Sequence, residues 1–139
     1  MVEVVVIGTE PPCIRCSLLV QRVNQEAEGA GIEVQVRKMD CRSSEAQALA
    51  RQWERGLGTA KDVAREGTVE VDWSRVAGLL KQDWSPDLDQ ALRPCQEKAD
   101  HLNMWMTPVL IVNGKLKHHG SVPEPELVRT WLREAAEEV

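Results

Sequence analysis

The feature that most constrains this chain is a Cys-x-x-Cys motif between a run of β-forming residues and an amphipathic segment. Residues 2–7 are apolar except for one glutamate, which predicts a central strand of a sheet covered on both faces. A short loop with glycine and prolines follows. Cys13-Ile14-Arg15-Cys16 then opens a segment, to about residue 30, whose apolar residues recur at helical spacing. The pattern therefore predicts a strand, a loop and a helix that begins at the first cysteine.

A cysteine at a helix N-terminus is a candidate nucleophile. The free N–H groups and partial positive charge of the helix stabilise a thiolate at Cys13, and Arg15 adds a positive charge with no acidic neighbour. Cys16 shares the same helical face, so it can close a disulfide onto Cys13. We favour a redox-active dithiol. The alternatives are half of a zinc site, which normally needs a second matching pair, and two inert core cysteines.

The net charge and the apolar content of the chain limit the kinds of molecule that it can bind. The 139 residues carry a net charge of −5, which indicates one domain and argues against nucleic acid or anionic membranes as main partners. We see no signal peptide and no apolar run of the roughly 20 residues that a membrane span needs. We therefore expect a cytoplasmic protein. In that compartment thiols are kept reduced, so four cysteines indicate redox or metal chemistry more than structural disulfides.

Beyond the first helix, the chain predicts a βαβ unit followed by a helical middle. Residues 32–37 alternate in polarity, which predicts a strand parallel to the first, with a right-handed crossover. Residues 41–106 read as a helical insertion, with Trp53 on an inner helix face and a helix end at Gly56. Helix starts are expected at Ser44, Thr59, Asp72 and Ser85. Pro94 should kink or split the last of these helices, and residues 69–71 are taken as loop.

The C-terminal part predicts a return to strands. Residues 109–112 form a buried strand, Asn113-Gly114 marks a hairpin turn, and residues 115–119 form a polar edge strand that lysines protect. Residues 123–138 form a last helix, with Leu127 among its inward side chains. The final core strand should run antiparallel to the first, which brings its start to the same edge as the cysteines.

This order of features resembles the thioredoxin-like superfamily. The match covers residues 1–40 and 107–139, about half the chain, and rests on Cys13-x-x-Cys16, Thr107-Pro108 and Gly120. The resemblance implies an α/β fold with a mixed sheet of about four strands, flanking helices, and an insertion at residues 41–106 placed as in DsbA-type proteins. It also implies that Cys13 attacks a disulfide, Cys16 resolves the mixed disulfide, and Pro108 is cis. A trans proline at a strand start is the alternative.

Four further residues are assigned to substrate binding or positioning: Pro12, Arg15, Thr107 and Pro108. The backbone groups of Thr107 are expected to face a bound peptide. The chain departs from the family because Pro12 replaces the usual Trp before the first cysteine. It also has no acidic residue inside the first strand that could act as a buried proton acceptor for Cys16.

Cys41 and Cys95 are candidate accessory thiols. Cys41 follows the second strand, so it is expected within roughly 10 Å of the dithiol if the two strands are neighbours. A relay through both thiols is one hypothesis, and two buried core cysteines is the interpretation that we favour. His118 and His119 should point to opposite faces of a solvated edge. Trp105 is either an apolar rim for a substrate or plain core.

The sequence thus predicts a thiol–disulfide oxidoreductase whose redox group is the Cys13–Cys16 couple, with no cofactor. Its partners would be a protein or small-molecule disulfide and a thiol reductant or reductase. The alternative is a protein that binds zinc or copper through Cys13, Cys16 and Cys41. A third hypothesis is a glutathione-dependent enzyme, in which three basic residues meet the glutathione carboxylates: Arg15, Lys38 and Arg42.

Overall fold

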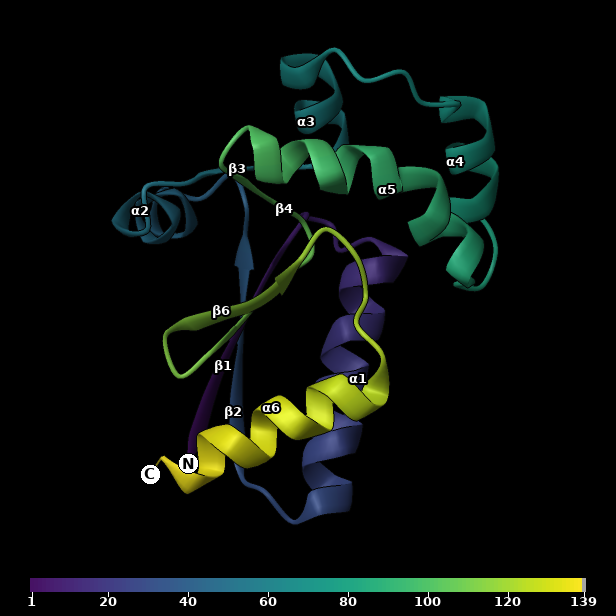
Figure 1. The fold of residues 1–139 in the computed structure, drawn as a ribbon. Coiled ribbons are helices and arrows are strands. Elements are labelled where there is room, and N and C mark those ends of the chain that lie inside the picture. Colours follow the sequence, from purple (N-terminus) through teal and green to yellow (C-terminus); the bar gives the residue numbers. More distant parts are fainter. Residues whose placement is uncertain (139) are drawn as a thin grey trace.

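The computed structural model describes residues 1–138 and has an α/β fold, with helices on both faces of a mixed four-stranded sheet (Figure 1). The strands lie in the order β2-β1-β5-β6, with bounds β1 Val2–Gly8, β2 Val34–Asp40, β5 Val109–Val112 and β6 Lys115–His119. The predicted mixed sheet is confirmed. β2 starts two residues later than expected, because the backbone N–H of Ile32 donates to Ala27 (2.9 Å) and completes the turn that ends the preceding helix.

The two faces of the sheet hold separate parts of the core. On one face Val2, Val4 and Val6 pack against α1 (Ile14–Ala30) and α6 (Pro125–Glu137). On the other face Ile7 belongs to a cluster that includes the buried alanines of α2 (Ser44–Gln52). Consecutive residues of β1 therefore point to opposite apolar layers, as its nearly continuous apolar sequence predicts.

Strand register brings three chain segments to one edge of the sheet. β1 and β2 are parallel, with Gly8 opposite Asp40, and the N–H of Cys41 donates to the carbonyl of Gly8 (2.8 Å). β5 runs antiparallel to β1, with Val109 opposite Ile7. The ends of β1 and β2 therefore meet the start of β5, as the sequence predicts.

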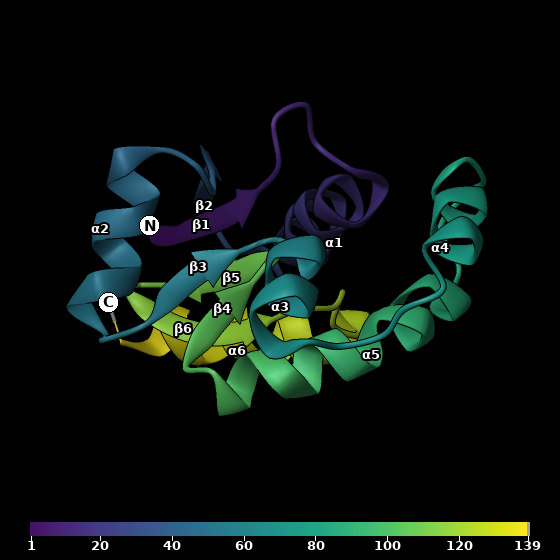
Figure 2. The same ribbon diagram turned by 90° about the horizontal axis from the view of Figure 1, so that it is seen from above.

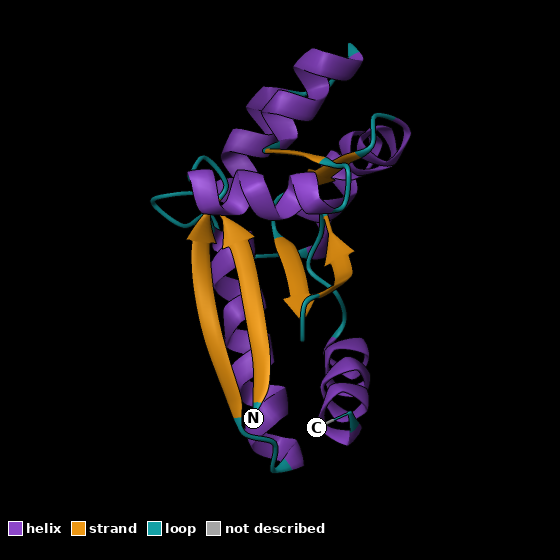
Figure 3. Cartoon of the chain, turned by 90° about the vertical axis from the view of Figure 1, so that its left-hand side faces the viewer, coloured by secondary structure: helices purple, strands orange, loops and turns teal. Residues whose placement is uncertain are grey.

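Residues 41–106 form the expected helical insertion. Besides α2 it contains α3 (Ala60–Gly67), α4 (Trp73–Leu80) and α5 (Pro86–His101). Figures 1 and 3 show α3, α4 and α5 beyond the end of the sheet towards which β1 and β2 point. α5 continues through Pro94, so of the two predicted outcomes, a kink or a split, the split does not occur. Four buried residues on one side of α5 provide packing that offsets the backbone hydrogen bond lost at the proline: Leu88, Leu92, Cys95 and Ala99.

Two short strands in the insertion were not predicted. β3 (Gly56–Gly58) and β4 (Met104–Met106) pair in parallel beside α3 (Figure 2). Gly56 therefore starts a strand instead of ending a helix. Trp105 is buried in the core, so it forms no exposed rim. Strands of three residues are too short to show a periodic sequence pattern, which explains why these were missed.

Helix caps agree with most of the predicted starts. Thr59 and Asp62 form a capping box at α3, and Asp72 caps α4. The N-cap of α2 is Ser43 and not Ser44, since the hydroxyl of Ser43 accepts from the N–H of Ala46 (3.1 Å). None of the helices in residues 1–138 is long and apolar enough to cross a membrane.

The hairpin and the last helix agree with the sequence except at one side chain. Asn113 and Gly114 have φ of 48° and 78°, the left-handed values that a two-residue turn between twisted strands requires. Residues 69–71 lie in a loop, as expected. Leu127, expected to point inward, is 47% exposed, and Trp53 in the insertion is 50% exposed. Leu127 lies at the margin of the apolar face of α6, where periodicity alone does not decide burial. Trp53 is the C-cap of α2, so it follows the last helical residue and does not lie on the inner helix face.

We expect Leu19→Ala to lower the free energy of unfolding by about 3 kcal/mol, because Leu19 is fully buried between α1 and the sheet. Leu127→Ala is the matched control, since the same change at an exposed site should cost no more than about 0.5 kcal/mol. Urea unfolding measures both values. Equal losses in the two variants would contradict the core described above.

Candidate active site

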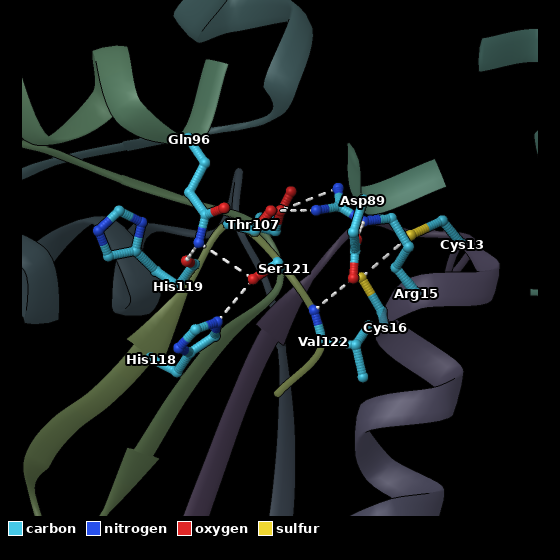
Figure 4. A network of polar contacts seen from close by, with 11 residues as sticks. Cys13, Arg15, Cys16, Asp89, Gln96, Thr107, His118, His119, Ser121 and Val122 are labelled. Atoms are coloured by element: carbon cyan, nitrogen blue, oxygen red, sulfur yellow. Dashed lines mark hydrogen bonds and ion pairs between the residues drawn. The ribbon is translucent and has the colours of Figure 1, made fainter. Parts of the chain in front are cut away.

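The two cysteines of the motif form a close pair at the start of α1. Cys13 is the N-cap residue and is partly exposed, whereas Cys16, in the first turn, is 4% exposed. Their Sγ atoms lie 3.2 Å apart in a hydrogen bond (Figure 4). The N–H of Cys13 donates to the hydroxyl of Thr9 (3.2 Å), which holds the loop before the helix against the pair. The expected juxtaposition of the two sulfurs is confirmed.

The environment makes the two thiols unequal. The hydrogen bond from the Cys16 thiol lowers the pKa of Cys13 to about 5, in spite of partial burial. The backbone N–H groups of Cys16 and Arg15 and the positive charge of Arg15 act in the same direction. The pKa of Cys16 is raised, because its thiol donates to Cys13 and is buried beside that thiolate. At neutral pH Cys13 is therefore the thiolate and Cys16 the protonated partner.

Arg15 points away from solvent and ties four segments together. Its Nε donates to Oδ1 of Asp89 in α5 (2.7 Å), and its two Nη atoms donate to the carbonyls of Thr107 (3.4 Å) and Gly120. Oδ2 of Asp89 accepts from the N–H of Val122 (3.0 Å; Figure 4). The side chains of Arg15 and Asp89 are 5% and 12% exposed. The expectation that Arg15 has no acidic neighbour is wrong, because the folded chain places Asp89 against its guanidinium.

Thr107 and Pro108 lie beside the motif, and their peptide bond is cis, as the resemblance implies. The expectation that the Thr107 backbone faces a bound peptide is wrong. Its N–H donates to the carbonyl of Gly58 in β3 (3.0 Å), and its carbonyl accepts from Arg15. Thr107 is 4% exposed. The strand that occupies this N–H is one that the sequence did not reveal.

A cleft of about 380 Å³ opens on the opposite flank of the pair. Its walls come from the loop after β1, the first turns of α1 and the end of β2. Cys16 lines it, together with Gly8, Glu10, Pro12, Lys38 and Asp40. Pro12, assigned to substrate positioning, is exposed at this cleft. The open side of the site is therefore the side of β2, the edge strand shown in Figure 3.

The other two cysteines are not brought together. Cys41 belongs to the cluster around Ile7, on the sheet face opposite α1. Cys95 packs in a separate cluster between α3 and α5. Burial raises the pKa of both thiols. These positions agree with the favoured interpretation of two buried core cysteines and give no support to the relay.

The sets of ligands proposed for a metal or for glutathione are not assembled. Within residues 1–138 there is no group of three or more His, Cys, Asp or Glu side chains that could hold a metal ion. Of the basic residues proposed for glutathione, Arg15 is bound to Asp89, and Arg42 forms an ion pair with Asp62 (2.7 Å). Lys38 alone faces the cleft.

The two histidines are not on a solvated edge, which corrects that expectation. Nε2 of His118 lies 2.7 Å from the hydroxyl of Ser121, and burial lowers the pKa of His118. His119 accepts from the N–H of Met106 (3.3 Å) and pairs with Asp100 of α5 (2.9 Å). Gln96 of α5 also donates to the carbonyl of His119 (3.0 Å; Figure 4). α5 therefore covers this end of β6.

We expect the Cys13 thiol to titrate near pH 5, so its alkylation by iodoacetamide should rise through that pH and then level off. Cys16→Ala removes the hydrogen bond that contributes most, and should move the Cys13 pKa up towards its ordinary value of 9.0. Thiolate absorbance and alkylation rate measure the shift. Cys95→Ala, a change at a buried cysteine in a separate core cluster, should leave the Cys13 titration where it is.

We expect Asp89→Ala to lower the free energy of unfolding by about 3 kcal/mol, because it leaves the buried guanidinium of Arg15 without its partner. Asp87→Ala is the control in the same first turn of α5, where the side chain is exposed. It should cost at most about 1 kcal/mol through the helix dipole. Urea unfolding of both variants measures these losses. A similar loss in each would contradict a stabilising role for the Arg15–Asp89 ion pair.

Comparison of the chain with protein-family models, with curated proteins and with solved structures found no match in any of the three. What the site can do must therefore be argued from its geometry. That geometry consists of a thiolate–thiol pair at a helix N-terminus, a buried arginine that closes one flank, and a cleft on the other.

Proposed function

We propose that this protein is a thiol–disulfide oxidoreductase that works through the Cys13–Cys16 couple. The observation that carries the proposal is the 3.2 Å contact between an ionised, partly exposed sulfur and a protonated, buried one at a helix N-terminus. A thiolate at neutral pH is the nucleophile that disulfide exchange needs. A second thiol within bonding reach can resolve the mixed disulfide before it escapes.

The reaction would proceed in two exchanges. The Cys13 thiolate attacks one sulfur of a substrate disulfide, forms a mixed disulfide and releases the first substrate sulfur as a thiolate. Cys16 then loses its proton and attacks Sγ of Cys13, which releases the second substrate sulfur. The substrate gains two electrons, and the protein is left with the Cys13–Cys16 disulfide. A thiol reductant or reductase would restore the dithiol.

The arrangement of the sheet supports a thioredoxin-like fold as part of this proposal. The motif follows β1 at the start of α1, β2 lies parallel to β1, and β5 and β6 form an antiparallel hairpin on its other side. The core at residues 1–40 and 107–139 would then carry residues 41–106 as an insertion of one domain. We place the protein in the cytoplasm, where thiols are kept reduced.

We expect a two-electron step when the protein is equilibrated across buffers of stepped redox potential and its thiols are counted by alkylation and intact mass. The step should vanish in Cys13→Ser and in Cys16→Ser. It should persist in Cys41→Ser and Cys95→Ser, which are matched controls because those thiols lie in separate core clusters. A step that survives either motif variant would refute the assignment.

A further inference from the structure

Of the two cysteines of the pair, Cys16 lines the cleft. Cys16 lines the cleft together with Gly8, whose missing side chain makes room for it. A Cβ built on Gly8 would lie 2.6 Å from Sγ of Cys16. Over the whole residue, only 4% of the surface of Cys16 is exposed. A molecule in the cleft therefore meets the Cys16 end of the Cys13–Cys16 pair.

In disulfide exchange one sulfur is attacked and the other leaves, and the position of the cleft selects which sulfur of the pair is attacked. An attacking thiolate approaches a disulfide along the sulfur–sulfur axis, and the sulfur at the far end leaves. A thiolate in the cleft would thus attack Sγ of Cys16 and expel Cys13. Cys13 leaves as a thiolate at the helix N-terminus, where backbone N–H groups and the charge of Arg15 lower its pKa whether or not Cys16 carries a proton.

The cleft walls carry charges of both signs. Lys38 lies opposite Val6 in the β1–β2 register, and Asp40 lies opposite Gly8, so both share the face on which Cys16 packs. Glu10, in the loop after β1, also lines the cleft. A carboxylate and an ammonium group on one small molecule complement this pattern. The volume of about 380 Å³ lies at the low end of the range for small-molecule sites, roughly 300–1,000 Å³.

We infer that the cleft binds a small thiol with an amino-acid head group, which reduces the oxidised Cys13–Cys16 pair by attacking Cys16. The inference rests on the proposed function and names the reductant class of that same site. Lys38 holds the carboxylate of the thiol, and Asp40 with Glu10 holds its ammonium group.

The electrons and atoms balance over two exchanges. The thiolate of the first small molecule forms a bond to Sγ of Cys16, and the Cys13–Cys16 bond breaks with its electron pair on Cys13. A second small thiol, as its thiolate, attacks the small-molecule sulfur of this mixed disulfide, and Cys16 leaves and takes up a proton. Two thiols become one small disulfide, and the protein disulfide gains two electrons.

The test uses L-cysteine as the probe on the fully oxidised protein. The reaction is quenched early with N-ethylmaleimide, which blocks the free thiolate, and the protein is digested with trypsin. Because Arg15 separates the two cysteines, trypsin places them on different peptides. We expect the cysteine adduct on the peptide that begins at Cys16 and the maleimide on the one that contains Cys13. An adduct on the Cys13 peptide would overturn the inference while leaving the oxidoreductase intact.

Charge variants test the head-group contacts. We expect Lys38→Gln and Asp40→Asn each to slow reduction by L-cysteine about threefold, the effect of one partly exposed ion pair, and to leave reduction by uncharged 2-mercaptoethanol unchanged. Lys117→Gln, on β6 at the other edge of the sheet, is the matched control. Equal effects on both thiols would overturn the head-group contacts. If oxidation forms no Cys13–Cys16 disulfide at all, the proposed function fails together with this inference.

Discussion

The ion pair between Arg15 and Asp89 is the interaction on which the site depends. A guanidinium is costly to bury unless its donors are paired, and here they reach a carboxylate and two backbone carbonyls. The partners come from α5, from the turn before β5 and from the loop after β6. The hydrogen bonds of this one side chain therefore hold the helical insertion and the hairpin against the helix that carries both cysteines.

This tether gives the dithiol a closed flank and an open flank. On the closed flank, Arg15 and Gly58 occupy the carbonyl and the N–H of Thr107, so that backbone is not free to pair with a substrate strand. On the open flank, Gly8 and the end of β2 leave the cleft beside Cys16. The proposed chemistry divides accordingly. In that proposal, substrate disulfides would meet the partly exposed Cys13, and a small reductant would meet Cys16.

The difference between the two thiols comes from position and not from residue type. Cys13 sits at the N-cap, where it accepts hydrogen bonds and retains access to solvent. Cys16 lies one turn further on, packed over Gly8, where burial and the neighbouring thiolate both favour its protonated form. Cys41 and Cys95 show the contrasting case, since burial is the main cause that raises the pKa of their thiols.

The sequence by itself determined the elements with a local signal. The strand and helix of the motif, the Asn113-Gly114 turn and the caps at Thr59 and Asp72 follow from periodicity and side-chain chemistry within a few residues. Only the tertiary structure decided which distant groups meet. Asp89 lies 74 residues from Arg15, and no local pattern marks it as a partner. The β3–β4 pair, the closed backbone of Thr107 and the cleft at Cys16 likewise exist only once separate elements pack, because each depends on contacts between segments that the chain order keeps apart.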